Sequence, residues 1–261
     1  REFDGTGEFA FTRRDRLDLA TDGERPDAEE TARERAADGF PVSYLDADSV
    51  RERYPALTME GFVGAVEYRD TGWVDPYSYA TALAGEATDR GATVETGRAV
   101  TGLLVEGGAV AGVETAGGAV RTDEVVLAAG WRTRDLLAGH LDVPVRPYRT
   151  QCVVLEPEEP LDESFPLVRV GSEHLYTRPE HNGDLLVGGM AELTDDPEGA
   201  STSADEAFRD QCAAAVPGLF HGFDTAGVVN DWAGVDTATP DARPILDAPA
   251  EAPEGLVVAT G

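Results

Sequence analysis

Two side chains with binding chemistry stand close together in the segment HLYTRPE. Tyr176 and Arg178 alternate along a short extended run, so both side chains point to the same face of the expected strand. A guanidinium can hold a carboxylate through two parallel hydrogen bonds, and a phenol can donate another. The pair predicts a site for a small carboxylate. The alternative is a surface arginine beside a packing tyrosine.

A strand that ends in very small residues is the second candidate. In DEVVLAAGWRTRDLL, a strand expected over 124–128 runs into Ala128-Ala129-Gly130 and then Trp131, before a helix-like segment. Small residues at a strand end let a ligand approach the backbone closely, and α/β folds bind ligands at the carboxyl ends of strands. Tight packing between helix and strand is the alternative interpretation.

Signatures of other chemistries do not occur in the sequence. It has no nucleophile elbow, P-loop, kinase signature or GxGxxG. Its histidines form no HExxH or other ligand pair, and its cysteines form no CxxC. We therefore expect no metal site and two ordinary buried thiols. These residues are His140, His174, His181, His221, Cys152 and Cys212.

The charge balance argues against several partners. The chain has 50 acidic and 21 basic residues, a net charge of −29, and every basic residue is Arg. Such a surface repels nucleic acid and anionic membranes. The sequence has no apolar run long enough to span a membrane and no signal-peptide core. We expect a cytoplasmic protein with an acidic surface adapted to concentrated salt, where charge repulsion is screened.

In the first part of the chain, helices and strands are expected to alternate, and they must position the candidate binding residues. An exposed helix is expected over residues 24–37, Asp46 can cap a short helix, and GFVGAVEYR reads as a strand. Asp75 and Pro76 begin a longer helix that Gly91 ends. Its expected apolar stripe is Tyr79, Ala80, Leu83 and Ala87.

The segment after this helix predicts an α/β unit with a small antiparallel insertion. A strand over 93–95 comes first, and a hairpin of 100–105 and 109–114 follows it. The strand over 124–128 then completes the unit.

From Val145 onward the pattern is typical of an antiparallel sheet. The runs YRTQCVVLEP, FPLVRVG, HLYTRPE and GDLLVGG are short, extended and separated by turn residues. The glycine pair that ends GDLLVGG can form a turn at a strand end. Ser203 and Glu206 predict a capping box for a helix that runs to about Val216. VVNDWAGV and GLVVAT are the last expected strands.

Four segments, in this order, resemble FAD-dependent oxidoreductases of the D-amino-acid oxidase family, in particular the sarcosine, dimethylglycine and glycine oxidase or dehydrogenase branch. GWVDPYSYATALAGEATDRGATV resembles the family's VDP helix and the strand after it, and DEVVLAAGWRTRDLL resembles VVxAAGxWS. WAGVDTATPDARPIL resembles WAGxxxxTPDxxPIxG, and GLVVATG resembles the start of ATGHGxxG. With PYRTQ and HLYTRPE, the resemblance covers most of the chain after about residue 40.

The resemblance implies the fold class α/β (α+β). A partial FAD-binding Rossmann-like domain would be joined to an antiparallel β-sheet substrate domain. The substrate domain would comprise residues 1–72 and 140–233, and the incomplete FAD-binding domain residues 73–139 and 234–261.

The resemblance also implies positions for ligand contacts. In the family, the turn after the AAG strand lies beside the FAD pyrophosphate, and the strand after the VDP helix leads to the adenosine. The implied cofactor-binding residues are Val100, Ala128, Ala129, Gly130, Trp131 and Gly261, with a packing aromatic as the alternative for Trp131. The implied substrate-binding residues are Tyr176 and Arg178, on the sheet that roofs the flavin in the family, and Trp73 and Met190 as pocket walls. No residue is identified as an obligatory catalytic base.

Parts of the family pattern are not matched. The dinucleotide fingerprint would precede Arg1 and a His-Gly turn would follow Gly261, so we expect the sequence to be an internal fragment. Glycine-oxidase-like relatives carry a carboxylate-binding Arg after WAG, where Asp236 stands here. The resemblance therefore favours the sarcosine and dimethylglycine branch over glycine oxidase.

The activity that the resemblance implies is flavin-dependent oxidation of the C–N bond of a secondary or tertiary amino acid to an imine. One alternative is another flavoenzyme of the superfamily, such as a glycerol-3-phosphate or tRNA-modifying enzyme. The other is a non-catalytic binding or subunit module. The expected partners are FAD and a small amino-acid or amine substrate.

Overall fold

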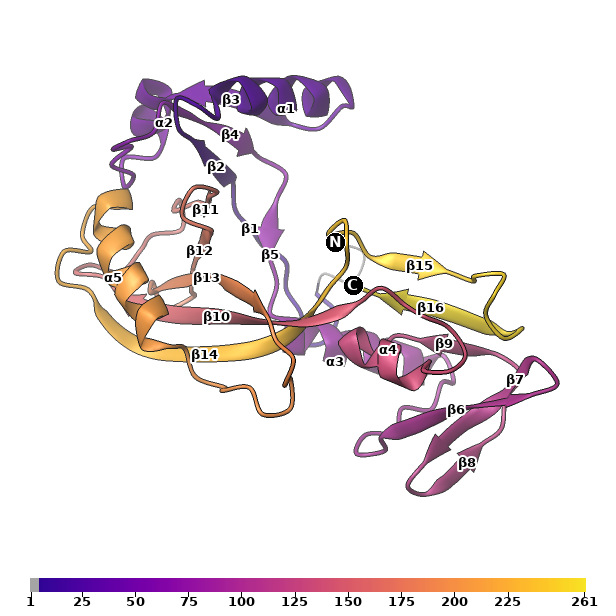
Figure 1. The fold of residues 1–261 in the computed structure, drawn as a ribbon. Helices are drawn as coiled ribbons and strands as arrows, with labels where there is room; N and C mark the ends of the chain where they lie inside the picture. The colour runs from indigo at the N-terminus through magenta and orange to yellow at the C-terminus, as the bar shows by residue number, and fades with distance from the viewer. Residues whose placement is uncertain (1–4) are drawn as a thin grey trace. The chain divides into compact units, whose positions relative to one another are not determined.

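The structure, a computed structural model, describes residues 5–261, and its helices and strands are labelled in Figure 1. The chain divides into two compact units. The first holds the chain up to Thr93, Gln151–Met190 and Thr202–Ala233, and the second holds Val94–Thr150, Ala191–Ser201 and Gly234–Gly261. These boundaries differ from those of the predicted functional domains, because the helix after Asp75 belongs to the first unit. The assignment of a function to each domain stays a prediction.

An eight-stranded sheet is the framework of the first unit. Its order is β14-β10-β13-β12-β11-β2-β4-β3. The pairings β11-β12, β12-β13, β2-β4 and β3-β4 are antiparallel, whereas β11 and β2 are parallel. The strands are β2 (Arg16–Ala20), β3 (Val42–Asp46), β4 (Gly64–Tyr68), β10 (Arg146–Glu156), β11 (Leu167–Val170), β12 (Leu175–Pro179), β13 (Leu185–Leu193) and β14 (Gly227–Ala238), of which β10, β13 and β14 continue into the second unit. A separate ribbon pairs β1 (Thr12–Arg13) with β5 (Gly72–Trp73).

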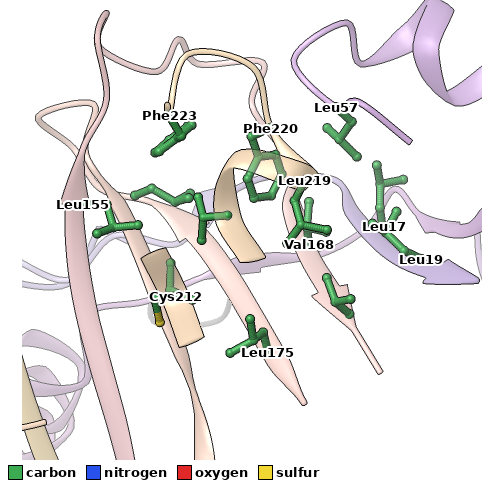
Figure 2. Packing of buried hydrophobic residues seen from close by; sticks show 14 of the residues in the cluster. Leu17, Leu19, Leu57, Leu155, Val168, Leu175, Cys212, Leu219, Phe220 and Phe223 are labelled. Carbon is green, nitrogen blue, oxygen red and sulfur yellow. The ribbon is translucent and has the colours of Figure 1, made fainter. Parts of the chain in front are cut away.

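Helix α5 (Glu206–Leu219) covers one face of this sheet (Figure 1). Alternate strand residues point toward the helix, as a pleated strand requires. Figure 2 shows Leu155 and Leu175 of the sheet near Cys212 of α5, with Phe220 just beyond the helix. The main core of the unit therefore lies on this face. The strand residues between them point to the other face of the sheet.

The start of α5 differs from the prediction. The helix begins at Glu206 with Asp205 as its N-cap residue, so the predicted capping box of Ser203 and Glu206 is wrong. The amide of Ala204 donates a 2.7 Å hydrogen bond to Asp231, which lies on β14. Asp231, which is distant in sequence, thus helps to fix the residue at which α5 begins.

The earlier helices begin where the sequence predicted. The side chains of Asp46 and Asp75 each accept a hydrogen bond from the amide three residues later, at 2.8 Å and 2.7 Å. Pro76 occupies the first turn of its helix, where a missing amide hydrogen costs nothing. The helices are α1 (Arg25–Ala37), α2 (Ala47–Arg53) and α3 (Pro76–Asp89).

The buried side of α3 is not the predicted stripe. Ala82 is buried, Leu83 and Ala87 are half-buried, and Tyr79 and Ala80 are exposed. An alanine-rich helix has more than one apolar side, and its packing partners decide which side is covered.

Two three-stranded sheets form most of the second unit. In one, of order β15-β16-β9, β16 and β9 are parallel; the other is the antiparallel sheet β6-β7-β8. The predicted hairpin is confirmed and gains β8, whereas residues 93–95 form no strand. The elements are β6 (Val100–Glu106), β7 (Ala109–Thr115), β8 (Gly118–Val120), β9 (Val125–Leu127), η1 (Gly130–Arg132), α4 (Thr133–Leu136), β15 (Ile245–Asp247) and β16 (Leu256–Thr260). Within the described part of the chain, no helix is long and apolar enough to cross a membrane.

Candidate functional site

A cavity of about 930 Å³ lies on the face of the eight-stranded sheet that α5 does not cover. Tyr176 and Arg178 both line it, as their alternation along β12 predicted. Cross-strand pairing places Gly188 opposite Tyr176 and Leu186 opposite Arg178. Cys152 lines the same cavity from β10. The sheet therefore presents a phenol, a guanidinium and a thiol to one open cavity.

Arg178 is held between an aromatic face and a carboxylate. Its guanidinium carbon lies 4.3 Å from the centroid of the Trp73 ring, and its Nη2 lies 3.0 Å from Oε1 of Glu180. The side chains of Arg178 and Glu180 are 23% and 26% exposed, so solvent screens the ion pair only in part. Trp73 also contacts the ring of His181, with 4.6 Å between centroids. The guanidinium is thus oriented before a ligand arrives, as two-pronged binding of a carboxylate requires.

Tyr176 meets a cysteine at the far end of its ring. Its Oη lies 3.7 Å from Sγ of Cys152, and either atom can be the donor. Burial is the main cause that raises the pKa of the Cys152 thiol, while the bond with Tyr176 and the nearby charge of Arg178 oppose this rise. Cys152 is therefore a neutral thiol at pH 7, a hydrogen-bonding partner more than a nucleophile. Both cysteines are buried and free, as the sequence predicted.

Asp75 and Met190 lie in different surroundings. Asp75 lines the cavity while it caps α3. The amide hydrogen bond from Ser78 is the largest cause that lowers the pKa of Asp75, and Arg178 adds a smaller lowering. Met190, predicted as a pocket wall, instead packs half-buried against the main core and has a left-handed backbone with φ of 46°.

In the second unit, the turn after β9 presents very small residues beside the end of a parallel neighbour. β9 and β16 run parallel, so their carboxyl ends lie side by side. Ala128 and Ala129 are exposed. Gly130 has a φ of +57°, and its carbonyl accepts a 2.9 Å hydrogen bond from Oγ1 of Thr260. This fixed, open turn lets a flat or phosphate-bearing cofactor approach the backbone at the strand ends.

The other predicted cofactor positions also lie in the second unit. Trp131 is half-buried in η1, and the guanidinium carbon of Arg132 lies 4.1 Å from the centroid of its ring. Val100 is the first residue of β6 and is 39% exposed. Gly261 follows β16 at the same strand end as Thr260. Their contacts with a cofactor stay predictions.

A second cavity of about 490 Å³ lies within the second unit, lined by Tyr148, Asp236, Arg243 and Gly261 among others. The hydroxyl of Tyr148 donates a 3.3 Å hydrogen bond to Oδ2 of Asp236. Burial and then Asp236 raise the pKa of Tyr148. Asp236 therefore has a phenol as its partner in this cavity.

Sequence reasoning missed two residues that line the first cavity, Glu180 and Cys152, and a third, Gly188, that pairs with Tyr176. Glu180 continues the alternation of Tyr176 and Arg178, so the same rule could have found it. Gly188 lies inside β13, so the strand-end turn predicted for its glycine pair is wrong. Cys152 becomes a neighbour of Tyr176 only through the strand order, which the sequence does not show. Among residues 5–261, no group of His, Cys, Asp and Glu is arranged to hold a metal ion.

Comparisons with known proteins agree with this fold. A D-amino acid dehydrogenase of Rhizobium rhizogenes is 31% identical over 217 residues, which are 82% of this chain and 50% of the relative. An L-proline dehydrogenase of P. horikoshii superposes with a TM-score of 0.86 at 22% identity, over 97% of this chain and 68% of that one. A glycine oxidase of Geobacillus kaustophilus superposes with a TM-score of 0.81 at 25% identity, over 96% of this chain and 66% of that one.

The chain spans about half the length of the curated relatives that it matches. The family model that describes an FAD dependent oxidoreductase matches residues 1–261. With a match over this whole length, the chain belongs to the FAD-dependent oxidoreductase family of the D-amino-acid oxidase class.

Proposed function

We propose that the chain is part of a flavin-dependent enzyme that oxidises the C–N bond of an amino acid to an imine. The proposed substrates are secondary or tertiary amino acids of the sarcosine and dimethylglycine kind, or glycine. The observation that carries this proposal is the pre-oriented Arg178 beside Tyr176 on one cavity wall. The names of the D-amino acid dehydrogenase, L-proline dehydrogenase and glycine oxidase support it, because each names an amino acid as substrate.

In this proposal the first unit binds and orients the substrate. Arg178 holds the carboxylate through two hydrogen bonds, while Trp73 and Glu180 keep the plane of the guanidinium fixed. The hydroxyl of Tyr176 supplies another hydrogen bond. The substrate nitrogen must be unprotonated to react. The apolar side chains of Val154 and Leu186 line the cavity and favour the neutral amine by limiting its hydration.

We propose FAD as the cofactor, bound by the second unit. The small, exposed turn from Ala128 to Gly130, with Trp131 after it and Gly261 at the neighbouring strand end, fits close approach of such a group to the backbone. Val100 is proposed to meet the adenosine part. When bound, FAD supplies the chemistry of accepting a hydride equivalent from the carbon next to the nitrogen.

A primary D-amino acid is the second candidate substrate, and the 31% identity to a D-amino acid dehydrogenase favours it. A phosphate substrate such as glycerol 3-phosphate fits the cavity less well. Arg178 is the one arginine among the described residues that line it, and Glu180 already balances its charge.

The test uses the full-length protein, purified with its flavin and kept free of oxygen. Sarcosine, dimethylglycine, glycine, D-alanine and glycerol 3-phosphate are added separately, and the visible flavin absorbance is followed. We expect bleaching by the N-methylated amino acids. Bleaching by D-alanine alone would select the second candidate, and bleaching by none of the amino acids would contradict the proposal.

A further inference from the structure

The ring of Tyr176 lies flat across the neighbouring strand, at a position where that strand carries a glycine. Tyr176 of β12 pairs directly with Gly188 of β13. A Cβ added to Gly188 would lie 2.1 Å from Cζ, 2.3 Å from Oη and 2.6 Å from Cε1 of this tyrosine. The phenol ring therefore occupies the space that any other side chain at residue 188 would need.

The backbone of Gly188 does not itself require glycine. Gly188 is not among the glycines with a positive φ, whereas Gly183 at the other end of the hairpin has a φ of 87°. Alanine could adopt the strand conformation at residue 188 without backbone strain. The close approach of the Tyr176 ring is thus the feature that needs a missing Cβ.

The hydroxyl end of the ring is anchored one strand further on. β13 lies between β12 and β10, and Cys152 of β10 places its Sγ 3.7 Å from Oη of Tyr176. The side chain thus reaches from its own strand over Gly188 to the thiol of the next strand but one. Cys152 and Tyr176 both line the cavity that holds Arg178, so the position of this hydroxyl sets where a ligand meets it.

We propose that Gly188 and Cys152 are positioning residues, which together hold the phenol of Tyr176 flat on the sheet and set its hydroxyl beside Arg178 for the substrate. Gly188 clears the path for the ring, and Cys152 binds the hydroxyl at its end. The claim that the Tyr176 hydroxyl meets the substrate rests on the proposed function of this cavity. The placement of the Tyr176 ring over Gly188 does not depend on that function.

The first test is Gly188→Ala in the full-length protein, read by alkylation of Cys152. The new methyl group displaces the ring, which uncovers the thiol, so labelling of Cys152 by iodoacetamide should become faster on the order of tenfold. Peptide mass spectrometry follows the two cysteines separately. Cys212 is fully buried in α5, and burial raises its pKa to about 12, so it reports opening of the whole fold. Its labelling should stay slow.

Gly227→Ala is the matched control. Gly227 begins β14 of the same sheet, its φ is not positive, and an added Cβ would meet nothing within 4 Å. Its labelling pattern should equal that of the unchanged protein. Tyr176→Ala provides a second route, because it uncovers the thiol without changing Gly188. In the Tyr176→Ala protein, the additional change Gly188→Ala should not make alkylation of Cys152 any faster.

The second readout is steady-state kinetics on an amino-acid substrate of the full-length enzyme. Gly188→Ala and Tyr176→Phe should raise KM by similar factors of about 2- to 12-fold, the value of one hydrogen bond, with a smaller change in kcat. Unchanged alkylation of Cys152 in Gly188→Ala and in Tyr176→Ala would overturn the positioning. Faster alkylation with unchanged KM would leave the positioning in place and overturn the substrate assignment of the cavity.

Discussion

The guanidinium of Arg178 stacks on the indole ring of Trp73, with its central carbon 4.3 Å from the ring centroid. The two residues belong to segments far apart in sequence, β12 and the β1-β5 ribbon. The stack and the ion pair with Glu180 together fix the orientation of the Arg178 guanidinium, and its binding role stays a proposal.

The first prediction concerns this stack. Trp73→Leu removes a contact that is worth about 0.5–2 kcal/mol at a partly desolvated site, so KM for an amino-acid substrate should rise roughly 2- to 30-fold. Steady-state kinetics of the full-length enzyme would measure it. Tyr68→Leu is a matched control, because Arg16 stacks on Tyr68 at 4.0 Å and neither residue lines the cavity of Arg178. An equal rise of KM in the control would contradict the prediction that the Trp73 stack orients Arg178 for the substrate.

Arg178→Lys should impair the enzyme although the charge is kept. Lysine is a point charge and cannot reproduce the planar, two-pronged contact with a carboxylate. Losing a charged hydrogen bond costs about 1.5–3 kcal/mol, or roughly 10- to 150-fold in KM or kcat/KM. The effect should shrink for a related amine without a carboxylate. Arg90→Lys, at an exposed ion pair with Glu86, serves as the control. Equal losses for both substrates would assign Arg178 another role.

The cap of α3 should make stability depend on pH. The amide of Ser78 is the main cause that holds the pKa of Asp75 below its ordinary value. A folded-state pKa below the unfolded value stabilises the fold above the unfolded pKa, and this contribution is lost as the pH falls through the folded-state pKa. Asp75→Asn keeps a capping oxygen but cannot ionise. Its melting temperature should therefore be lower than that of the unchanged protein at pH 7 and converge with it in acid. A constant difference across the range would contradict this assignment.

Salt should stabilise the protein. A net charge of −29 without Lys makes the folded chain repel itself at low ionic strength, and screening weakens that repulsion. We expect the melting temperature to rise from low to molar KCl. Surface ion pairs alone would predict the reverse trend, so a flat or falling melting temperature would contradict a surface adapted to salt.

The 261-residue chain by itself should not retain FAD stoichiometrically. It contains no GxGxxG, the fingerprint that places a dinucleotide pyrophosphate on a helix N-terminus, and it spans about half the length of its curated relatives. Flavin content after gel filtration of the isolated chain measures this. A yellow protein with one FAD per chain would show that the turn after β9 and its neighbours are sufficient for binding.

The sequence by itself determined the features that depend on near neighbours along the chain. Asp46 and Asp75 mark two helix starts, because a cap needs only the amide three residues later. The hairpin of β6 and β7 follows from its glycine turn. Alternation along β12 put Tyr176 and Arg178 on one face, since side chains of a strand point to opposite faces in turn.

Tertiary structure alone decided which residues meet across strands and which side of a helix is covered. Trp73 under Arg178, Gly188 under Tyr176 and Cys152 at its hydroxyl all join segments far apart in the chain. The parallel pairing of β11 with β2 and the start of α5 are of the same kind. Local periodicity carries no information about strand order or register, because these depend on packing the whole sheet against one core.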